Sequence, residues 1–126
     1  MQILIPMTGN GTRFKSAGYK RLKPFIKVHD KPIIHWISKM FSVDQHNITF
    51  ICRKDHYQEL SYFRKELNEA APKAKIFFVE DWKKQGPAID ILKSDQIIDD
   101  EKPVLISYCD YFMNWDYPSF KKKLEK

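Results

Sequence analysis

The sequence is poor in cysteine and contains no long apolar segment. Its two cysteines, Cys52 and Cys109, lie far apart and form no Cys-x-x-Cys pattern, which favours reduced thiols over a disulfide framework. No stretch approaches the roughly 20 apolar residues that a membrane-spanning helix needs. The N-terminal apolar run is too short for a signal peptide and has no basic region before it. We therefore expect a cytoplasmic protein without a membrane partner.

Internal repeats, low-complexity segments and linkers are also missing. The 126 residues fit one domain, which we expect to cover residues 1–126. Apolar residues make up 43% of the chain, enough for a core, so wholesale disorder is excluded. The 22 basic and 16 acidic residues give a net charge of +6, which favours an anionic ligand. The basic residues form no single patch: several lie in residues 13–31 and three more form the run from Lys121 to Lys123, so we expect no nucleic-acid partner and a solvated helix face for the run.

Apolar runs alternate with segments of helical periodicity. Four runs predict buried strands, at residues 2–7, 48–52, 75–79 and 103–108. Four other segments predict helices, at residues 32–41, 55–70, 87–97 and from Pro118 onward. This order predicts an α/β fold, a Rossmann-like three-layer α/β/α arrangement with a mostly parallel central sheet. The continuous apolar strands agree with a sheet that helices cover on both faces.

Helical spacing indicates which side chains pack inward. We expect an inward stripe on each of the first three helices, formed by Ile33, Ile34, Ile37, Met40 and Phe41, by Leu60, Phe63 and Leu67, and by Ala88, Ile91 and Leu92. Asp30 is expected near the start of the first helix, and Asp116 is expected to cap the last one. Residues 8–29 contain no predicted element, and a loop of that length inside a domain is usually functional.

Residues 7–14 carry the strongest functional signal. They follow an apolar strand and read Met-Thr-Gly-Asn-Gly-Thr-Arg-Phe, with Lys23 ten residues after Arg13. Gly9 and Gly11 let the backbone bend and bring its N–H groups close to a ligand. Successive N–H groups in such a turn form an anion-binding concavity. The segment predicts a nucleoside triphosphate site whose candidate residues are Met7, Gly9, Asn10, Gly11, Thr12, Arg13 and Lys23.

Two further segments follow predicted strands. Gln85 and Gly86 come after the third strand, and Cys109 and Asp110 come directly after the fourth. In open α/β sheets, ligands bind at the carboxyl ends of the strands. Because three segments converge on this edge, we predict one site that includes Gln85, Gly86 and Asp110.

Two other known classes of glycine-rich nucleotide-binding loop match residues 7–14 less well. A dinucleotide fingerprint, Gly-x-Gly-x-x-Gly, needs a third glycine, and Phe14 occupies that position. Gly18 and Pro24 make the next segment a poor helix, whereas the fingerprint opens one. The Gly-Lys-[Ser/Thr] ending of a Walker loop is absent as well. A dehydrogenase-type dinucleotide domain is therefore disfavoured.

The chain resembles the nucleotidyltransferases that activate sugar phosphates, the nucleoside-diphosphate-sugar pyrophosphorylases. Their signature is an apolar strand, a glycine-rich loop ending Gly-Thr-Arg-[Phe/Leu] and a downstream Pro-Lys-Pro segment that runs to Gly-Lys-Pro. The corresponding residues here are Gly9 to Phe14 and then Leu22 to Pro32, with Leu22 in place of proline and Asp30 in place of glycine. The resemblance extends to residues 85–88 and 104–110.

The resemblance implies transfer of a nucleoside monophosphate from a triphosphate to a sugar phosphate or similar acceptor, with release of pyrophosphate. It assigns catalytic roles to Arg13 at the β- and γ-phosphates, to Lys23 at the α-phosphate and to Asp110 as a ligand of Mg²⁺. Gly86 would let the base approach the backbone, and Gln85 would read the edge of the base. Bacterial capsule or other surface-glycan synthesis is the usual setting of the family.

Enzymes of this family are commonly about twice as long as this chain. We therefore expect an incomplete nucleotidyltransferase fold that lacks most of the acceptor half. The alternative is a nucleotide-binding module without catalysis of its own. An incomplete sheet would expose an apolar edge, through which we expect copies of the chain to associate.

The remaining histidine and aromatic side chains show no pattern that indicates a catalytic role. His29, His35, His46 and His56 show no metal-ligand spacing, so we expect structural roles for them. The aromatic residues near Asp110 either line a pocket or pack in the core, namely Tyr108, Tyr111, Phe112 and Trp115.

Overall fold

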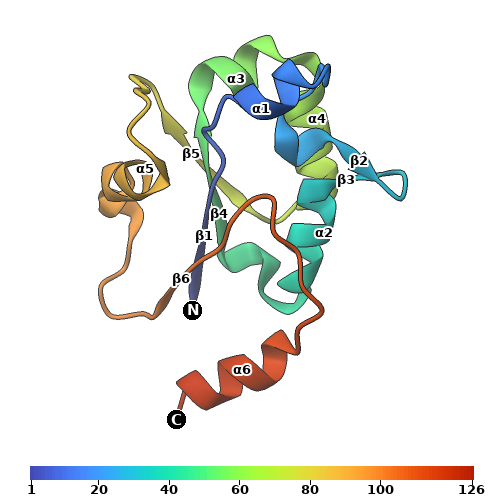
Figure 1. Cartoon of the computed structure of the whole chain (residues 1–126). Coiled ribbons are helices and arrows are strands. Elements are labelled where there is room, and N and C mark those ends of the chain that lie inside the picture. Colours follow the sequence, from blue (N-terminus) through green and yellow to red (C-terminus); the bar gives the residue numbers. More distant parts are fainter.

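Four parallel strands form the central sheet. In the computed structural model, which describes residues 1–126, they are β1 (Gln2–Pro6), β4 (Ile48–Arg53), β5 (Lys75–Val79) and β6 (Val104–Ile106). Their order across the sheet is β5-β4-β1-β6, and each neighbouring pair is parallel. Figure 1 shows helices on both sides of this sheet, which confirms the predicted α/β fold.

The strand order creates a switch point between β1 and β6. The chain leaves β1, adds β4 and β5 on one side, and then crosses back to place β6 on the other side of β1. The crossover from β1 to β4 passes through α2 (Ile33–Met40) on one face of the sheet, and the crossover from β5 to β6 passes through α5 (Pro87–Lys93) on the other, so the carboxyl ends of β1 and β6 lie side by side between the two layers. Ligands of open α/β sheets bind in the crevice at such a switch point.

The larger part of the core lies on one face of the sheet. Alternate residues of β1 and β4 point to this face, where Ile3, Ile5, Ile48 and Phe50 are fully buried. They pack under α2 (Ile33–Met40) and α4 (Ser61–Ala70), whose inward side chains include the predicted Ile34, Ile37, Phe63 and Leu67. This alternation is the period-two pattern of a strand that meets two different layers. No helix is long and apolar enough to cross a membrane.

The opposite face is covered only by α5 (Pro87–Lys93). A smaller cluster there contains Leu4, Ile51 and Val79, with Ile91 packed against it. The prediction that Ala88 and Leu92 face inward is wrong, because both are exposed, Leu92 by 68%. The buried residues of α5 itself and of its end are instead polar, namely Asp90 and Ser94.

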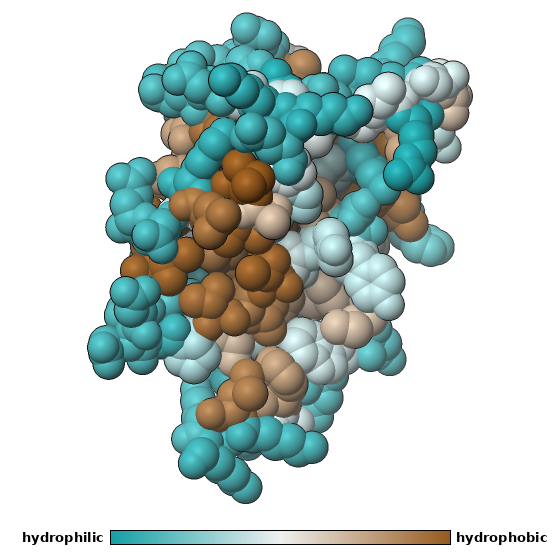
Figure 2. Space-filling model, turned by 60° about the vertical axis from the view of Figure 1, so that its left-hand side comes forward, coloured by the Kyte–Doolittle hydropathy of each residue, from teal (hydrophilic) through white to brown (hydrophobic).

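Strand β6 is shorter and more exposed than the predicted strand at residues 103–108. It pairs with β1 on one side only, and Ile106 is 58% exposed. Val104 and Ile106 point to the same face as Leu4, because Ile106 lies opposite Leu4 in the register. Figure 2 shows apolar side chains gathered on this side of the molecule, which α5 covers in part.

Residues 8–29 are not structureless, which corrects a second prediction. They contain α1 (Thr12–Ser16), a 3₁₀ turn (Lys23–Phe25) and strand β2 (Lys27–Val28), which pairs antiparallel with β3 (Lys31–Pro32). The helix begins after Gly11, whose φ of 61° lies in the left-handed region. Asp30 forms the tip of the β2–β3 hairpin with His29, instead of capping α2.

Two predicted helices are interrupted. Residues 55–70 form α3 (Lys54–Glu59) and α4, because Leu60 adopts an extended conformation with ψ of 111°. Residues 87–97 form α5 and a separate 3₁₀ turn (Asp95–Ile97). Neither break contains glycine or proline, so propensity gives no signal for it.

The C-terminal helix α6 (Tyr117–Leu124) is fastened to a 3₁₀ segment (Ser42–Asn47) that follows α2. Buried Asp44 accepts hydrogen bonds from Tyr117 Oη at 2.7 Å and Lys121 Nζ at 2.9 Å. Lys121 is therefore not part of a purely solvated face. Asp116 caps the helix as predicted, accepting from the Ser119 N–H.

Candidate functional site

The glycine loop leaves β1 and returns toward the neighbouring strand. The Met7 N–H donates to the Ile51 carbonyl at 2.9 Å, so Met7 and Thr8 are held at the end of the sheet and are buried. Gly9 is exposed, and a Cβ there would meet no atom within 4 Å. Gly11 needs its left-handed φ to begin α1, which most other residues adopt only with strain. The loop backbone is therefore open on its outer side.

A cleft of about 510 Å³ lies between this loop, the start of α5 and the segment after β6. The structure brings most of the predicted site residues to its walls, namely Met7, Gly9, Asn10, Thr12, Arg13, Gly86 and Asp110. Tyr108, for which the sequence left a pocket or a core position open, lines the cleft as well, and residues outside the predicted site complete the lining, namely Pro6, Thr8, Trp82, Lys84, Pro87, Asp90 and Cys109.

Lys23 and Asp110 meet at the edge of this cleft. Lys23 Nζ lies 2.6 Å from Asp110 Oδ2 and 5.0 Å from the centre of the Phe14 ring. Lys23 comes from the 3₁₀ turn, and Asp110 follows β6, so the contact joins segments 87 residues apart in the chain. A smaller hollow of about 150 Å³ adjoins this pair, and Gly11 and Lys23 line it together with Asp110.

Gly86 and Gln85 are placed differently. Gly86 has a φ of 88°, which glycine adopts readily, and it lines the cleft directly before α5. Gln85 is exposed and does not line the cleft. The nearby wall is formed by Trp82 and Lys84, and Trp82 Nε1 is buried without a hydrogen-bond partner.

Arg53 joins the glycine loop to the Trp82 wall, and sequence reasoning missed it. Its Nη1 donates to Asn10 Oδ1 at 2.6 Å, and its Nε donates to Asp55 Oδ1 at 2.9 Å. Its guanidinium lies 4.3 Å from the centre of the Trp82 ring. The only sequence signal was a basic residue at the carboxyl end of a predicted strand.

Asp90 is the second residue that sequence reasoning missed. It is buried on α5, where it accepts a hydrogen bond from Thr8 Oγ1. This contact ties the helix that follows Gly86 to the glycine loop. Asp90 belongs neither to the predicted inward stripe of its helix nor to a sequence motif. Only its contacts in the structure therefore identify it as a residue of the cleft.

Burial and charge tune the titratable groups around the cleft. Burial, and then the neighbouring Asp110 carboxylate, raises the pKa of the Cys109 thiol to about 12, so Cys109 is neutral. The hydrogen bond from Arg53 lowers the pKa of Asp55, which keeps that pair charged. Burial, and then the charge of Arg53, lowers the pKa of His56 to about 4, so this histidine is neutral at pH 7.

Asp110 is the cleft residue best suited to a divalent cation. No group of three or more His, Cys, Asp and Glu side chains gathers anywhere in the chain. Of the two carboxylates that line the cleft, Asp90 is buried and accepts a hydrogen bond from Thr8, whereas the Asp110 side chain is partly exposed to the cleft. One accessible carboxylate suits Mg²⁺, which keeps several waters and takes phosphate oxygens as further ligands.

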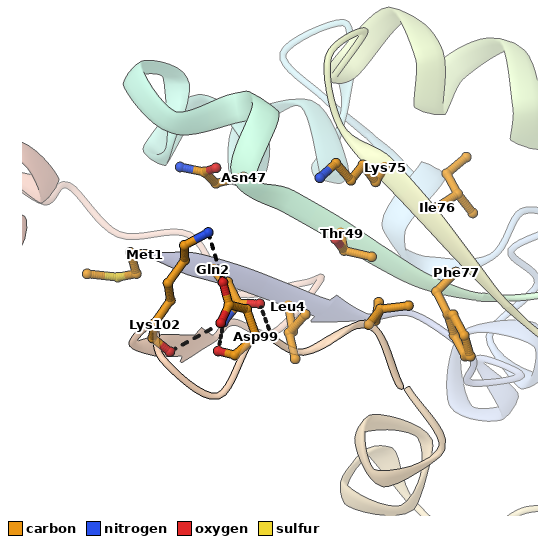
Figure 3. A pocket seen from close by; sticks show the side chains of 11 residues that line it. Met1, Gln2, Leu4, Asn47, Thr49, Lys75, Ile76, Phe77, Asp99 and Lys102 are labelled. Carbon is orange, nitrogen blue, oxygen red and sulfur yellow. Dashed lines mark hydrogen bonds and ion pairs between the residues drawn. The ribbon is translucent and has the colours of Figure 1, made fainter. Parts of the chain in front are cut away.

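A hollow of about 560 Å³ lies at the other end of the sheet (Figure 3). It is lined by side chains at the amino ends of the strands, including Gln2, Thr49 and Lys75. Three of its polar residues bond to one another: the Gln2 amide bonds to backbone atoms of Asp99, and Lys102 pairs with the Asp99 carboxylate at 2.9 Å. The glycine loop, Lys23 and Asp110 are absent from its lining, so we do not assign the site there.

The strand order, the open glycine loop and the cleft at the switch point define a Rossmann-like α/β domain with a cleft at the carboxyl edge of its sheet. The chain belongs to the nucleotidyl transferase family, whose model matches residues 3–126. This match confirms the family resemblance that the sequence predicts. A comparison with curated protein sequences gave no match.

Solved structures support the same fold. A nucleoside-diphosphate-sugar pyrophosphorylase from Vibrio cholerae is 20% identical with a TM-score of 0.64, over 94% of this chain and 53% of that one. A UDP-glucose pyrophosphorylase complexed with UDP-glucose is 19% identical with a TM-score of 0.66, over 98% of this chain and 51% of that one. An apo-UDP-glucose pyrophosphorylase is 17% identical with a TM-score of 0.64, over 98% of this chain and 55% of that one. The chain thus spans about half the length of these structures.

Proposed function

We propose that the chain supplies the nucleotide-binding part of an Mg²⁺-dependent nucleotidyltransferase. The reaction transfers a nucleoside monophosphate from a triphosphate to a sugar phosphate or similar phosphorylated acceptor, and it releases pyrophosphate. The setting we propose is cytoplasmic synthesis of precursors for bacterial capsule or another surface glycan. The observation that supports this most is that Gly9, Arg13 and Asp110 line one cleft and that Lys23 contacts Asp110 there.

The glycine loop binds the triphosphate in this proposal. Backbone N–H groups from Gly9 to Thr12 surround its phosphates, and Arg13 holds the β- and γ-phosphates. Gly86, which has no side chain, lets the base approach the backbone near Trp82. Gln85 has a weaker claim to read the base, because it lies outside the cleft.

Lys23 and Asp110 act at the reacting phosphorus. An oxygen of the acceptor phosphate attacks the α-phosphorus, the bond to the β-phosphate breaks, and pyrophosphate leaves. Lys23 neutralises the charge that develops at the α-phosphate, and Arg13 stabilises the leaving pyrophosphate, so positioning and charge supply the catalysis. Asp110 would hold Mg²⁺, which neutralises phosphate charge when bound.

A non-catalytic nucleotide-binding module is the second candidate. It rests on the same cleft, which brings Gly9, Arg13 and Asp110 together within a chain that spans 51–55% of the length of the three pyrophosphorylase structures. In this alternative, the cleft binds a triphosphate and a separate polypeptide supplies the acceptor site. The two candidates share the same nucleotide contacts and differ in pyrophosphate release.

Calorimetry with each nucleoside triphosphate and Mg²⁺ tests the shared part of the proposal. We expect Arg13→Ala to weaken triphosphate binding by about tenfold or more, because a charge-assisted contact is lost. The matched control is Lys20→Ala, since Lys20 is an exposed residue of the same segment that lines neither the cleft nor the smaller hollow.

A pyrophosphate-release assay across sugar phosphates separates the two candidates. Release that Lys23→Ala slows by orders of magnitude supports the enzyme. Triphosphate binding without release on any acceptor supports the module. If no nucleoside triphosphate binds, both candidates are wrong.

A further inference from the structure

A mainly apolar pocket of about 500 Å³ shares Asp110 with the nucleotide cleft and has no other lining residue in common with it. Three elements form it: the β2–β3 hairpin, α2 and the segment between β6 and α6, which runs beside α2 in Figure 1. We call it the aromatic pocket, and its lining residues are Val28, His29, Ile33, Trp36, Asp110 and Phe112.

The walls of the aromatic pocket are fixed by contacts between its elements. Trp36 Nε1 donates to the Val28 carbonyl at 2.9 Å, which orients the indole toward the hairpin. The Trp36 and Phe112 rings are 6.5 Å apart between centres and inclined at 68°. The Met113 N–H contacts the Met40 sulfur at 3.4 Å, which holds the segment after Phe112 against the end of α2.

Asp110 belongs to both the nucleotide cleft and the aromatic pocket. In the proposed reaction, the acceptor phosphate must lie within about 3.5 Å of the α-phosphorus, beside Lys23 and Asp110. The organic part of the acceptor then needs a cavity that opens at Asp110 and is not filled by the nucleotide. Besides the cleft, the smaller hollow of about 150 Å³ and the aromatic pocket of about 500 Å³ adjoin Asp110.

Size selects between these two cavities. Small-molecule sites commonly measure about 300–1,000 Å³, so the smaller hollow is too tight for an acceptor. The aromatic pocket falls within that range. From this geometry, and resting on the proposed nucleotidyl transfer, we infer that the aromatic pocket binds the organic part of the phosphorylated acceptor.

The lining predicts the chemical class of that acceptor. Four of the six lining residues are apolar and only His29 and Asp110 could hydrogen-bond to a ligand, so most hydroxyls of a bound sugar would lose water without gaining a partner. A cationic group is also disfavoured, because Lys39 Nζ already lies 5.5 Å from the centre of the Trp36 ring. Lys31 stands at the hairpin beside the pocket and adds a second positive charge. The acceptor is therefore a phosphomonoester with an uncharged organic group that carries few hydroxyls.

NMR titration of the tryptophan side chains tests this inference on the whole chain. The three tryptophans give three indole N–H signals, which Trp→Phe variants assign one by one. We expect phenyl phosphate to shift the Trp36 signal and a nucleoside triphosphate with Mg²⁺ to shift the Trp82 signal. Phenyl phosphate should bind at least about fivefold more tightly than glucose 1-phosphate or phosphocholine, as stacking on the two rings predicts.

Phe112→Ala provides the matching variant. Phe112 is 51% exposed, so its removal leaves the core intact, and we expect phenyl phosphate affinity to fall about fivefold with triphosphate affinity unchanged. Tyr111→Ala is the control, because Tyr111 is exposed and does not line the pocket.

The outcomes distinguish this inference from the proposed function. A Trp82 shift with triphosphate but no Trp36 shift with phenyl phosphate overturns the acceptor site and leaves the proposed function standing. Equal or tighter binding of glucose 1-phosphate or phosphocholine overturns the acceptor class. If no triphosphate shifts the Trp82 signal or binds by calorimetry, the proposed function fails and the acceptor role fails with it.

Discussion

Removing the carboxylate of Asp44 should detach α6 from the rest of the fold. Asp44 is 4% exposed and accepts hydrogen bonds from Tyr117, which is fully buried, and from Lys121. In Asp44→Ala, the Tyr117 hydroxyl keeps only the Met1 sulfur, 3.9 Å away, as a partner. A buried hydroxyl left without a good partner costs about 1–3 kcal/mol.

The ion pair with Lys121 adds less to the cost. The Lys121 side chain is 26% exposed, so its ammonium regains water, and we assign this pair about 1 kcal/mol at most. The total of about 1–4 kcal/mol corresponds to a fall in Tm of roughly 3–16 °C for a domain of this size. Tyr117→Phe should cost only about 1 kcal/mol, because it removes the hydroxyl and leaves no unpaired group.

The pH dependence gives an independent check on Asp44. Burial alone raises the pKa of this carboxyl, but the hydrogen bonds from Lys121 and Tyr117 outweigh burial and hold the pKa below its usual value. Because folding lowers the pKa of Asp44, its carboxylate stabilises the fold at pH values above about 3.9, the pKa of an aspartate in the unfolded chain. This stabilisation is lost as the pH falls through the lower pKa of Asp44 in the folded protein. The stability gap between wild type and Asp44→Ala should therefore be constant from about pH 5 to 7 and shrink below about pH 4.

Urea unfolding of both proteins at pH 7, 5 and 3.5 measures that gap. A double variant, Asp44→Ala with Tyr117→Phe, should be less destabilised than the sum of the single variants, because the orphaned hydroxyl is gone. A gap that widens in acid, or a fall in Tm of less than about 3 °C for Asp44→Ala, would refute this account of the network.

Two further predictions concern the glycine loop and the hairpin. Arg53→Lys keeps the positive charge but loses the guanidinium stack on Trp82 and the hydrogen bonds to Asp55. We therefore expect triphosphate affinity, measured by calorimetry, to fall about three- to tenfold. Unchanged affinity would mean that Arg53 does not position the glycine loop. His29 and Asp30 both have positive φ, of 49° and 61°, so replacing the pair with Asn-Gly should raise the unfolding free energy by about 1 kcal/mol in urea; an unchanged or lower urea midpoint would contradict that strain.

The parallel sheet could be predicted because its strands are buried on both faces. Ile3 and Ile5 enter the larger core while Leu4 enters the smaller cluster, so the sequence of β1 shows no polar alternation. Because such a strand shows no polar alternation, its sequence does not indicate which face of the sheet is fully covered by helices. For α5, apolar spacing favoured Ala88 and Leu92, yet these residues face solvent because the α5 layer covers only part of its side of the sheet.

Short elements and long-range pairs could not be predicted for separate reasons. Helix α1 has five residues and follows a left-handed glycine, so it contains too few turns to show periodicity. The contacts of Arg53 with Asn10 and of Asp90 with Thr8 join residues 43 and 82 positions apart. Such pairs depend on strand order, which a single sequence does not specify.

The convergence of the predicted site residues on one cleft follows from the strand order. Any loop that follows β1 and any residue that follows β6 must come together once these strands are neighbours, and the Lys23–Asp110 pair at 2.6 Å is the direct result. The contents of the site depend on more than topology. Trp82 lines the cleft and Phe112 lines a second pocket that shares Asp110, through segments whose conformation the sequence leaves open, so the sequence predicts where the segments converge and only the structure indicates what surrounds them.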